Sequence, residues 1–549
     1  MKLTELTSYA DAQLQFSKDA LWALFDGSRD RLNIGHECVD RHDPTRRAVS
    51  VAKADGGYEH ISFGELKAWS NRVANTLSTA GLAPGARVAI MLEPGLAFYA
   101  LLFGAMKAGF VAVPLFTLFG PDGLALRLDD CEPALVFTSA DLASTAGTAG
   151  QGRSNPPRIV VADESWLSEL RDAGDAFTPA TTADDMAMFQ YTSGTTRELP
   201  EAVKHRHRAI VTVAVAALYA TGVRPGDRFM CPSSPAWGHG LWHGTLAPLG
   251  LGVSIAAYAG RFRPERLLEA LSDLEITNVS AAATHYRMMR NCGAADRWRY
   301  QLEKLSFTGE PIDDETALWV RDTFGRLPAS MYGSTEVGVI IADYPGAADH
   351  AVRLGALGKP VPGQEVAVLD PSGRPCATGQ VGEIMLKRGD AWFPTKDLGL
   401  IDSDGYFFHR GRADDVIISA GWTMSAVEIE NTLLAHPEVA EAAVIGVPDA
   451  ERGQVVKAFI VRRLAPPAPD AGRHAPVAGG QPKAPARDEQ QINNQELAAE
   501  LVRFTKARLS QHEYPRQIAF VTELPKSTTG KISRAKLREA ERNERGDKS

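Results

Sequence analysis

The chain has 549 residues, which is more than one hydrophobic core organises, so two or more domains are expected. A formal net charge of −8 gives no electrostatic reason to expect nucleic acid or an anionic membrane as a partner. Five scattered cysteines without a CxxC pair argue against a disulfide framework or a zinc ribbon, and predict a reducing, cytoplasmic location.

From Ser62 onward, helical and strand patterns alternate. Ser62 and Glu65 have capping-box spacing, and the apolar residues after them recur at helical intervals as far as Gly81. The next predicted elements are strand 88–92, helix 96–108, strand 111–115, helix 121–130 and strand 134–138. This alternation predicts an α/β fold with a mainly parallel sheet.

The apolar stretch 97–116 is about long enough to span a bilayer and contains one charged residue, Lys107. Gly109 and Pro114 interrupt it, so a helix that leads into a buried strand explains it better. We therefore expect no membrane span.

A short apolar run, 186–189, predicts a buried strand that ends at a loop of small and hydroxyl residues. The loop contains Thr192, Ser193, Gly194, Thr195 and Thr196. Backbone N–H groups and hydroxyls in such a loop can bind a phosphate, although a run of this kind alone more often forms an ordinary polar loop.

The helix–strand alternation resumes after this loop and continues to about residue 360. Its predicted elements are helix 207–221, strands 228–231 and 253–258, helix 264–274, strand 277–281, helix 312–324 and strand 329–331. Hairpins follow, in which 366–370 pairs with 382–387 and 399–402 pairs with 406–409.

The pattern changes again after Arg412 and predicts a small α+β domain. Its elements are strand 416–419, helix 425–435, strands 442–447 and 455–462, helix 495–510 and strand 517–522. We assign residues 1–412 to a large N-terminal domain with a β-rich subdomain and 413–549 to the small domain. Residues 465–490, rich in Ala, Pro and Gly, are expected to be a disordered insertion.

Four further motifs lie downstream of the loop. They are Tyr332-Gly333-Ser334-Thr335-Glu336, Asp397 in PTKDLG, Gly411–Asp415 and the turn Pro525–Ile532. The first offers an aromatic face, a hydroxyl and a carboxylate suited to Mg²⁺. A lone aspartate before a hairpin is usually a turn residue, and the last motif alone would be an unremarkable basic turn.

The order and spacing of these motifs resemble the acyl-adenylate-forming superfamily, in particular the acetyl and medium-chain acyl-CoA synthetase branch. The resemblance extends to 234–240, 281–287, Thr308–Pro311 and 357–363, and covers nearly the whole chain apart from the first few dozen residues and the insertion. It implies that a carboxylic acid reacts with ATP, with Mg²⁺ bound, to form acyl-AMP, and that coenzyme A then displaces AMP.

The resemblance also implies roles for the motif residues. The loop Thr192–Thr196 binds phosphates, and Thr192 with Glu336 holds Mg²⁺. Gly309, Glu310, Pro311, Tyr332, Gly333 and Ser334 belong to the nucleotide site; Tyr332 stacks on adenine and Thr335 contacts the α-phosphate. Asp397 accepts hydrogen bonds from the ribose, with Arg412 beside it.

For the small domain, the resemblance implies that Lys531 reaches the α-phosphate during acyl-AMP formation. Asp414 matches the hinge about which this domain rotates. Gly421 and Trp422 would border the tunnel for coenzyme A.

The phosphate loop departs from the family pattern. A residue is inserted, Arg197 or Glu198 replaces a glycine, and Glu201 replaces a lysine. Arg197 or Lys204 could supply the missing positive charge. Thr423 stands where this branch often has a phosphate-contacting arginine. The part of the site that binds the phosphates therefore departs most from the family pattern.

The acyl pocket is predicted to contain Trp237, Gly238, His239 and Leu241, and to be apolar and uncharged. Such a pocket favours a short- or medium-chain, alicyclic or aromatic acid. His239 and His243 have helical spacing for a metal, but without a third ligand nearby a role in pocket lining or packing is favoured.

Two rival functions remain open at this point. One is an adenylating enzyme that loads a carrier protein, and the other is a catalytically impaired nucleotide-binding homologue, suggested by Glu201. The retained Lys531, Glu336 and Asp397 favour a complete ligase. A monomer or homodimer is expected.

Overall fold

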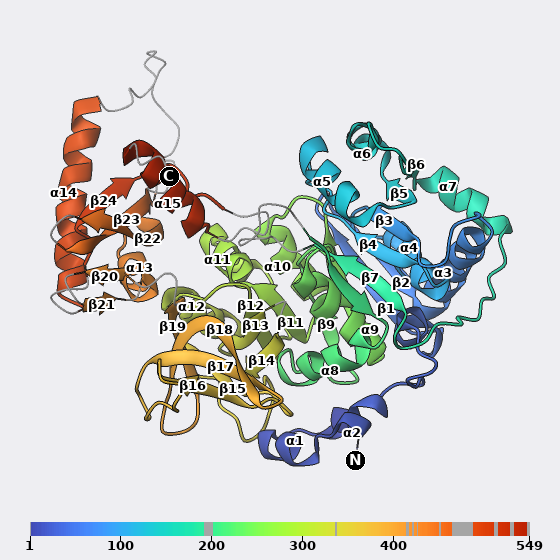
Figure 1. The fold of residues 1–549 in the computed structure, drawn as a ribbon, viewed down its shortest axis with the longest axis horizontal. Coiled ribbons are helices and arrows are strands. Elements are labelled where there is room, and N and C mark those ends of the chain that lie inside the picture. Colours follow the sequence, from blue (N-terminus) through green and yellow to red (C-terminus); the bar gives the residue numbers. More distant parts are fainter. Residues whose placement is uncertain are drawn as a thin grey trace.

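A computed structural model describes residues 2–191, 201–334, 337–412, 417–419, 422–424, 426–449, 452–463, 487–509, 514–526 and 532–545. These residues form three sheets, and the α/β architecture expected from the sequence is confirmed. Figure 1 shows the C-terminal sheet with its helices (orange to red) set apart from the other two.

The largest sheet has 13 strands in the order β16-β17-β18-β19-β15-β14-β13-β12-β11-β9-β10-β1-β2. Six neighbouring strands run parallel: β13 (Ala329–Ser334), β12 (Lys304–Thr308), β11 (Asn278–Ala282), β9 (Arg228–Met230), β10 (Ser254–Ala259) and β1 (Arg47–Lys53). The remaining strands pair antiparallel: β2 (Tyr58–Ser62), β14 (Gly338–Ala342), β15 (Ala356–Pro360), β16 (Val366–Leu369), β17 (Gly382–Arg388), β18 (Ala391–Ile401) and β19 (Phe407–Arg412).

The second sheet has six strands in the order β6-β5-β3-β4-β7-β8. Its parallel strands are β3 (Arg87–Met91), β4 (Val111–Pro114), β5 (Leu135–Thr138), β6 (Arg158–Val161) and β7 (Met186–Gln190). The edge strand β8 (Val203–Arg206) pairs antiparallel with β7, so the predicted phosphate loop connects the two strands of a hairpin.

Helices fill the space between these sheets and cover their outer faces (Figure 1). The inner helices are α3 (Phe63–Ser78), α4 (Leu96–Lys107), α8 (Ala209–Tyr219) and α9 (Ala247–Gly250). The other helices before residue 330 are α1 (Tyr9–Gln15), α2 (Lys18–Trp22), α5 (Pro121–Cys131), α6 (Ala143–Gly150), α7 (Glu164–Glu169), α10 (Pro264–Asp273), α11 (Ala283–Cys292) and α12 (Asp314–Phe324). The capping box predicted at Ser62 is confirmed: its hydroxyl accepts from the Glu65 N–H, and Glu65 accepts from the Ser62 N–H.

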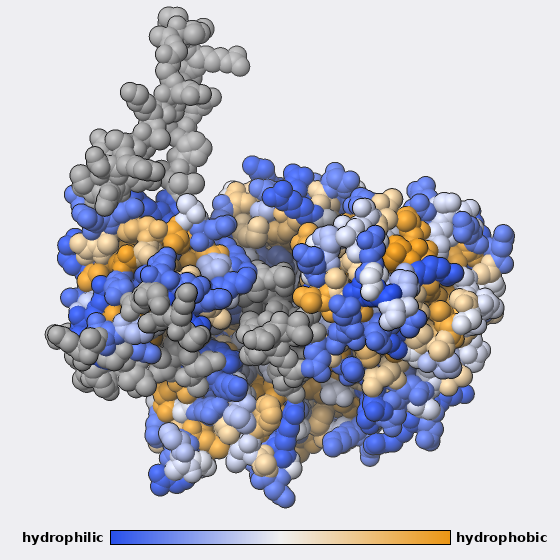
Figure 2. Space-filling view, turned by 45° about the horizontal axis from the view of Figure 1, so that its top comes forward, coloured by the Kyte–Doolittle hydropathy of each residue, from blue (hydrophilic) through white to orange (hydrophobic). Residues whose placement is uncertain are grey.

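The apolar stretch around Lys107 is α4 followed by β4, as predicted. The Lys107 ammonium is buried and donates to Asp40 Oδ1 at 2.5 Å, Ser70 Oγ at 2.8 Å and Asn71 Oδ1 at 2.8 Å. These partners, from the segment that ends at Asp40 and from α3, compensate a charge that could not otherwise be buried. In the part of the chain that the structure describes, no helix is both long and apolar enough to cross a membrane. On the face shown in Figure 2, hydrophilic side chains surround small hydrophobic patches.

The C-terminal sheet has the order β21-β20-β23-β22, with β24 paired to β23. Its strands are β20 (Ile417–Ser419), β21 (Trp422–Met424), β22 (Val439–Asp449), β23 (Gly453–Arg462) and β24 (Gln517–Phe520), and its helices are α13 (Ala426–Leu434), α14 (Arg487–Lys506) and α15 (Arg534–Arg545). The predicted insertion lies outside the described residues up to 486, whereas its last residues, 487–490, already belong to α14.

Burial changes the pKa of five histidines in the N-terminal part, of which His207 is buried and His42, His205, His243 and His285 are half-buried. Burial lowers the pKa of each to about 4, so each stays neutral in the folded protein. Between pH 6.5 and 4 the unfolded chain binds more protons than the folded one, so stability is lost as the pH falls through this range. We expect Tm to fall by roughly 10 °C between pH 7.5 and pH 5. Circular dichroism melts would check this, and a constant Tm over that range would contradict it.

Candidate active site

The predicted acyl and nucleotide segments meet at one edge of the largest sheet. β9, β11, β12 and β13 are parallel neighbours, so their carboxyl ends lie on the same side, where open α/β sheets bind ligands. Trp237 follows β9, Gly309 follows β12, and Tyr332 lies near the end of β13. The fold therefore brings together segments that are up to a hundred residues apart in the sequence.

His239 connects the β9 segment to β11. Its side chain is buried, with Nδ1 at 3.1 Å from Ser233 Oγ and Nε2 at 2.9 Å from Ser280 Oγ. The Trp237 ring lies edge-on to this imidazole, with ring centroids 5.3 Å apart, while Leu241 is fully buried in the core between the sheets. The acyl segment thus also contains a hydrogen-bonded group of two hydroxyls and an imidazole next to Trp237, and the apolar, uncharged character of the acid pocket stays a prediction.

The two histidines of the helical pair lie close together in the structure. The ring centroids of His239 and His243 lie 6.2 Å apart within a π-helix, His239–Leu246. Within the described ranges, no group of three His, Cys, Asp or Glu side chains could hold a metal ion.

The end of β7, which leads into the predicted phosphate loop, lies against the acyl segment. The indole Nε1 of Trp242 donates to Gln190 Oε1 at 2.7 Å. A Cβ atom at Gly238 would lie 2.6 Å from Gln190 Nε2, so the two residues approach closely. The strand end that leads into the phosphate loop and the acyl segment are therefore neighbours.

Glu310 is held by two residues of α11. Thr284 donates to Glu310 Oε1 at 2.7 Å, and Arg287 lies 3.3 Å from both Glu310 Oε1 and Asp313 Oδ2. Burial alone would lower the pKa of Arg287, but the two carboxylates raise it, so the guanidinium stays charged. Gly309, which precedes Glu310, is half-buried with a φ of 99°, and Pro311, which follows it, is exposed.

Tyr332 and Asp397 lie together on neighbouring parts of the sheet. The phenol donates to Asp397 Oδ2 at 2.7 Å, and Asp397 Oδ1 lies 3.6 Å from both Arg412 Nη1 and His409 Nε2. Burial, then the nearby Asp397 carboxylate, raises the pKa of Tyr332, so the phenol keeps its proton. The predicted grouping of Tyr332, Asp397 and Arg412 is present in the structure.

Gly333 is required by a close approach of two strands. A Cβ atom there would lie 1.9 Å from the carbonyl oxygen of Gly338 in β14. Ser334 pairs with the same glycine and ends β13 with an exposed side chain.

Several predicted residues lie outside the described residues. They are Thr192, Ser193, Gly194, Thr195, Thr196, Arg197, Thr335, Glu336, Asp414, Gly421 and Lys531. The backbone of Trp422 begins β21.

Four residues of the site were not singled out from the sequence: Thr284, Arg287, Thr395 and His409. Thr284 and Arg287 fall in a stretch that the family resemblance already included, and their spacing of three places them on one helix face. Thr395 Oγ1 lies 3.2 Å from the Tyr332 phenol. The places of Thr395 and His409 in the site depend on the pairing of β18 with β19. This pairing gives no local sequence signal.

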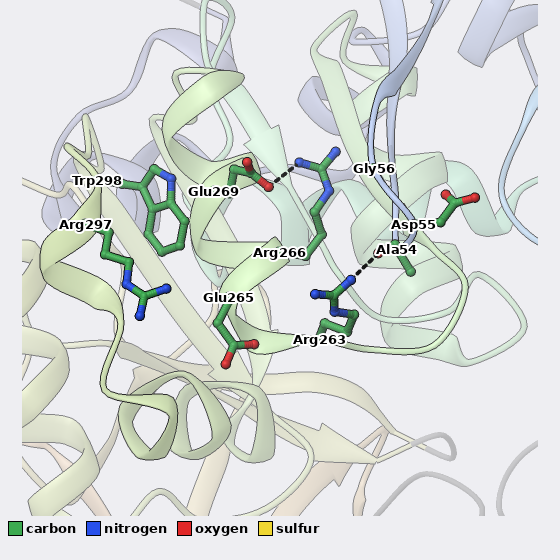
Figure 3. A pocket seen from close by; sticks show the side chains of 9 residues that line it. All are labelled: Ala54, Asp55, Gly56, Arg263, Glu265, Arg266, Glu269, Arg297 and Trp298. Carbon is green, nitrogen blue, oxygen red and sulfur yellow. Dashed lines mark hydrogen bonds and ion pairs between the residues drawn. The ribbon is translucent and has the colours of Figure 1, made fainter. Parts of the chain in front are cut away.

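A separate cavity of about 270 Å³ lies between the β1–β2 turn and the N-terminal end of α10 (Figure 3). Three arginines line it, but so do three carboxylates: Arg263, Arg266 and Arg297 against Asp55, Glu265 and Glu269. Arg266 is also held by Glu269 at 2.7 Å. The balanced charge gives it no attraction for a triphosphate, and it contains none of the predicted site residues.

The comparisons with protein families agree with this geometry. Residues 37–393 match the AMP-binding enzyme family, and residues 428–531 match the AMP-binding enzyme C-terminal domain. The chain belongs to the AMP-binding enzyme family. A curated relative, the acetyl-coenzyme A synthetase of Bacillus subtilis (strain 168), is 29% identical over 93% of this chain and 91% of its own.

Two solved structures extend the comparison. An acyl-CoA synthetase of Brucella canis is 31% identical, covers 98% of this chain and 100% of its own, and has a TM-score of 0.71. ATP-bound MatB from Rhodopseudomonas palustris is 25% identical, covers 92% of this chain and 98% of its own, and has a TM-score of 0.73.

Proposed function

We propose that this AMP-binding enzyme is an AMP-forming acyl-CoA ligase. A carboxylate oxygen attacks the α-phosphorus of ATP, the bond to the bridging oxygen breaks, and pyrophosphate leaves. The coenzyme A sulfur then attacks the acyl carbon and AMP leaves. The observation that carries this proposal is the convergence of the acyl segment, Glu310 and the Tyr332–Asp397 pair on one sheet edge, in a chain related to acyl-CoA synthetases.

The nucleotide binds along the ends of β12 and β13. Asp397 accepts from the ribose hydroxyls, while Tyr332, whose phenol already donates to Asp397, offers its ring face to adenine. Arg412 Nη1 lies 3.6 Å from the carboxylate and helps to orient it. Glu310, fixed by Thr284 and Arg287, lines the same site.

The phosphates bind to the loop Thr192–Thr196, and Thr335 contacts the α-phosphate. Thr192 and Glu336 supply the oxygen ligands that Mg²⁺ prefers, and each follows the carboxyl end of a parallel strand, β7 or β13. Mg²⁺ held by these two residues would neutralise charge on the phosphates. Lys204, exposed on β8, lies 5.3 Å from the Phe189 ring and can supply the charge that Glu201 does not.

The small domain begins after Arg412 and alternates between two orientations about Asp414. In the first, Lys531 reaches the α-phosphate; in the second, Gly421 and Trp422 border the coenzyme A path. Two ion pairs join it to the large domain here, Arg410–Glu428 at 3.6 Å and Arg463–Glu315 at 3.7 Å. Exposed pairs of this kind contribute only about 0–1 kcal/mol, so they do not prevent rotation.

The acid is of the short- or medium-chain, alicyclic or aromatic class, and Trp237 limits the pocket. Trp237→Gly removes the largest half-buried side chain of the acyl segment. We expect preference to move toward longer or bulkier acids, with each accommodated methylene changing kcat/KM by about 10- to 200-fold. Measuring kcat/KM across an acid series would check this. Trp298→Ala, in the separate cavity, is the control, and an unchanged profile in Trp237→Gly would place Trp237 outside the pocket.

The function is tested with a panel of carboxylic acids, ATP and free coenzyme A, by following AMP and thioester. We expect both products in equal amounts for a subset of the acids. AMP formation without a thioester to free coenzyme A would support a carrier-protein acceptor instead. Absence of AMP and pyrophosphate with every acid would support an impaired homologue.

A further inference from the structure

The ends of the phosphate loop are defined by the β7–β8 hairpin. Gln190 pairs with Val203 and Phe189 with Lys204, so Tyr191 directly follows β7 and Ala202 directly precedes β8, at the two ends of the loop. Both are buried, at 2% and 6% exposure, respectively. Whatever fixes these two residues fixes the base from which the loop extends.

One carboxylate oxygen binds both of them. Asp130 Oδ2, near the C-terminal end of α5, accepts from the Tyr191 phenol at 2.7 Å and from the Ala202 backbone N–H at 3.0 Å. The two donors lie on opposite sides of the β7–β8 hairpin. The Asp130 carboxylate therefore links the two ends of the loop. Hydrogen bonds to an ionised acceptor are among the stronger ones in proteins.

The same turn of α5 holds Tyr191 a second time. The phenol also lies 2.9 Å from the Arg127 carbonyl oxygen, and the Arg127 guanidinium lies 4.0 Å from the Phe119 ring and 5.8 Å from the Tyr191 ring. Burial, together with neighbouring Cys131 and Asp130, raises the pKa of Tyr191, so the phenol remains a donor. Arg127 thus contacts only Tyr191 of the two loop ends, whereas Asp130 contacts both Tyr191 and Ala202.

We propose that Asp130 is a positioning residue for ATP: its carboxylate ties Tyr191 to Ala202 and thereby preorganises the phosphate loop. The inference rests on the proposed function, because it assigns the loop to the triphosphate. A loop whose ends are fixed loses less conformational entropy when it binds its ligand. The anchor matters for ATP, with its β- and γ-phosphates, and not for acyl-AMP, which has lost them.

The test compares three variants. Asp130→Ala removes both acceptor contacts, and we expect the Kd for Mg·ATP, measured by titration calorimetry, and the KM for ATP to rise about 10- to 100-fold. Asp130→Asn keeps an acceptor oxygen and should stay within about 3-fold of wild type. Asp129→Ala is the matched control, since its neighbouring carboxylate instead pairs with Arg153 at 2.7 Å, and it should leave both constants unchanged.

The second half-reaction distinguishes a positioning role of Asp130 from a folding defect in the variant. Thioester formation from synthetic acyl-AMP and coenzyme A should be unchanged in Asp130→Ala, with a Tm within a few degrees of wild type, since two buried donors lose their acceptor. Equal losses in both half-reactions, or no change in the Kd for Mg·ATP, would overturn the proposal. If Asp130→Ala does not fold, Tyr191→Phe removes one of the two contacts and should still raise the Kd by several-fold; an unchanged Kd there would also overturn it.

The anchor and the proposed function can fail separately. A wild-type enzyme that binds Mg·ATP but forms no thioester would refute the ligase, while the calorimetric comparison of Asp130→Ala with Asp129→Ala would still decide the role of the anchor.

Discussion

Lys531→Ala is expected to lower the rate of acyl-AMP formation by about 10²–10⁴-fold, because a positioned cation that stabilises charge on the reacting phosphate and carboxylate is lost. In the proposed mechanism the second step does not need this residue, since the small domain would have rotated by then. Thioester formation from synthetic acyl-AMP and coenzyme A should therefore keep its rate. Single-turnover assays of the two half-reactions measure the difference directly.

Lys526→Ala is the matched control for this result. Lys526 lies five residues earlier, and its ammonium pairs with Glu441 Oε1 at 2.7 Å within the C-terminal sheet region. Removing it deletes the same charge from the same segment without touching the proposed role. If Lys526→Ala and Lys531→Ala slow acyl-AMP formation equally, or if Lys531→Ala slows both half-reactions equally, the assignment of Lys531 is wrong.

Asp397→Ala should produce the second large effect, a loss of Mg·ATP affinity of about 10- to 100-fold. The carboxylate accepts from Tyr332 at 2.7 Å and faces Arg412 and His409 at 3.6 Å, so its removal leaves one phenol and two basic groups without their shared partner. The proposed charge-assisted hydrogen bonding to the ribose would be lost at the same time, and one such bond contributes about 1.5–3 kcal/mol. Titration calorimetry with Mg·ATP measures the affinity.

Two further variants test whether the loss of Mg·ATP affinity comes from the Asp397 carboxylate itself. Tyr332→Phe keeps the ring and removes only the phenol, so it should weaken binding several-fold less than Asp397→Ala. Asp390→Ala changes an exposed aspartate in the β17–β18 turn and should leave the affinity unchanged. Equal affinities for Asp397→Ala and wild type would remove Asp397 from the nucleotide site and leave it as a strand-pairing residue.

The repetitive parts of the fold could be predicted from the sequence because their signals are local. The Ser62 capping box, the apolar run of α4 and the alternating strands each depend on residues a few positions apart. The first 50 residues gave no such signal, yet they are held by distant partners: Asp349 Oδ2 accepts from the Ala10 N–H at 3.0 Å, and Asp40 pairs with Lys107. Contacts of this kind cannot be read from local periodicity.

In the candidate site, too, some residues could be predicted from the sequence and others depend on contacts between distant segments. The family resemblance indicated Tyr332, Asp397 and Arg412 as a group, and strand pairing of β18 with β19 explains why they meet, since Asp397 and Arg412 are direct cross-strand partners. It did not indicate Asp130, which acts through a helix 61 residues before Tyr191. The hydroxyls that bind His239 were also missed, because Ser233 follows β9 whereas Ser280 belongs to β11.

Transfer of an isotope tests the acyl-AMP route most directly. An accepted acid labelled with ¹⁸O in both carboxylate oxygens is incubated with ATP, Mg²⁺ and coenzyme A, and the products are analysed by mass spectrometry. Since a carboxylate oxygen attacks the α-phosphorus and remains on phosphorus when the sulfur displaces AMP, one ¹⁸O should appear in AMP and one in the thioester carbonyl, with none in pyrophosphate. Label in inorganic phosphate together with ADP, or unlabelled AMP beside labelled thioester, would contradict an acyl-AMP intermediate.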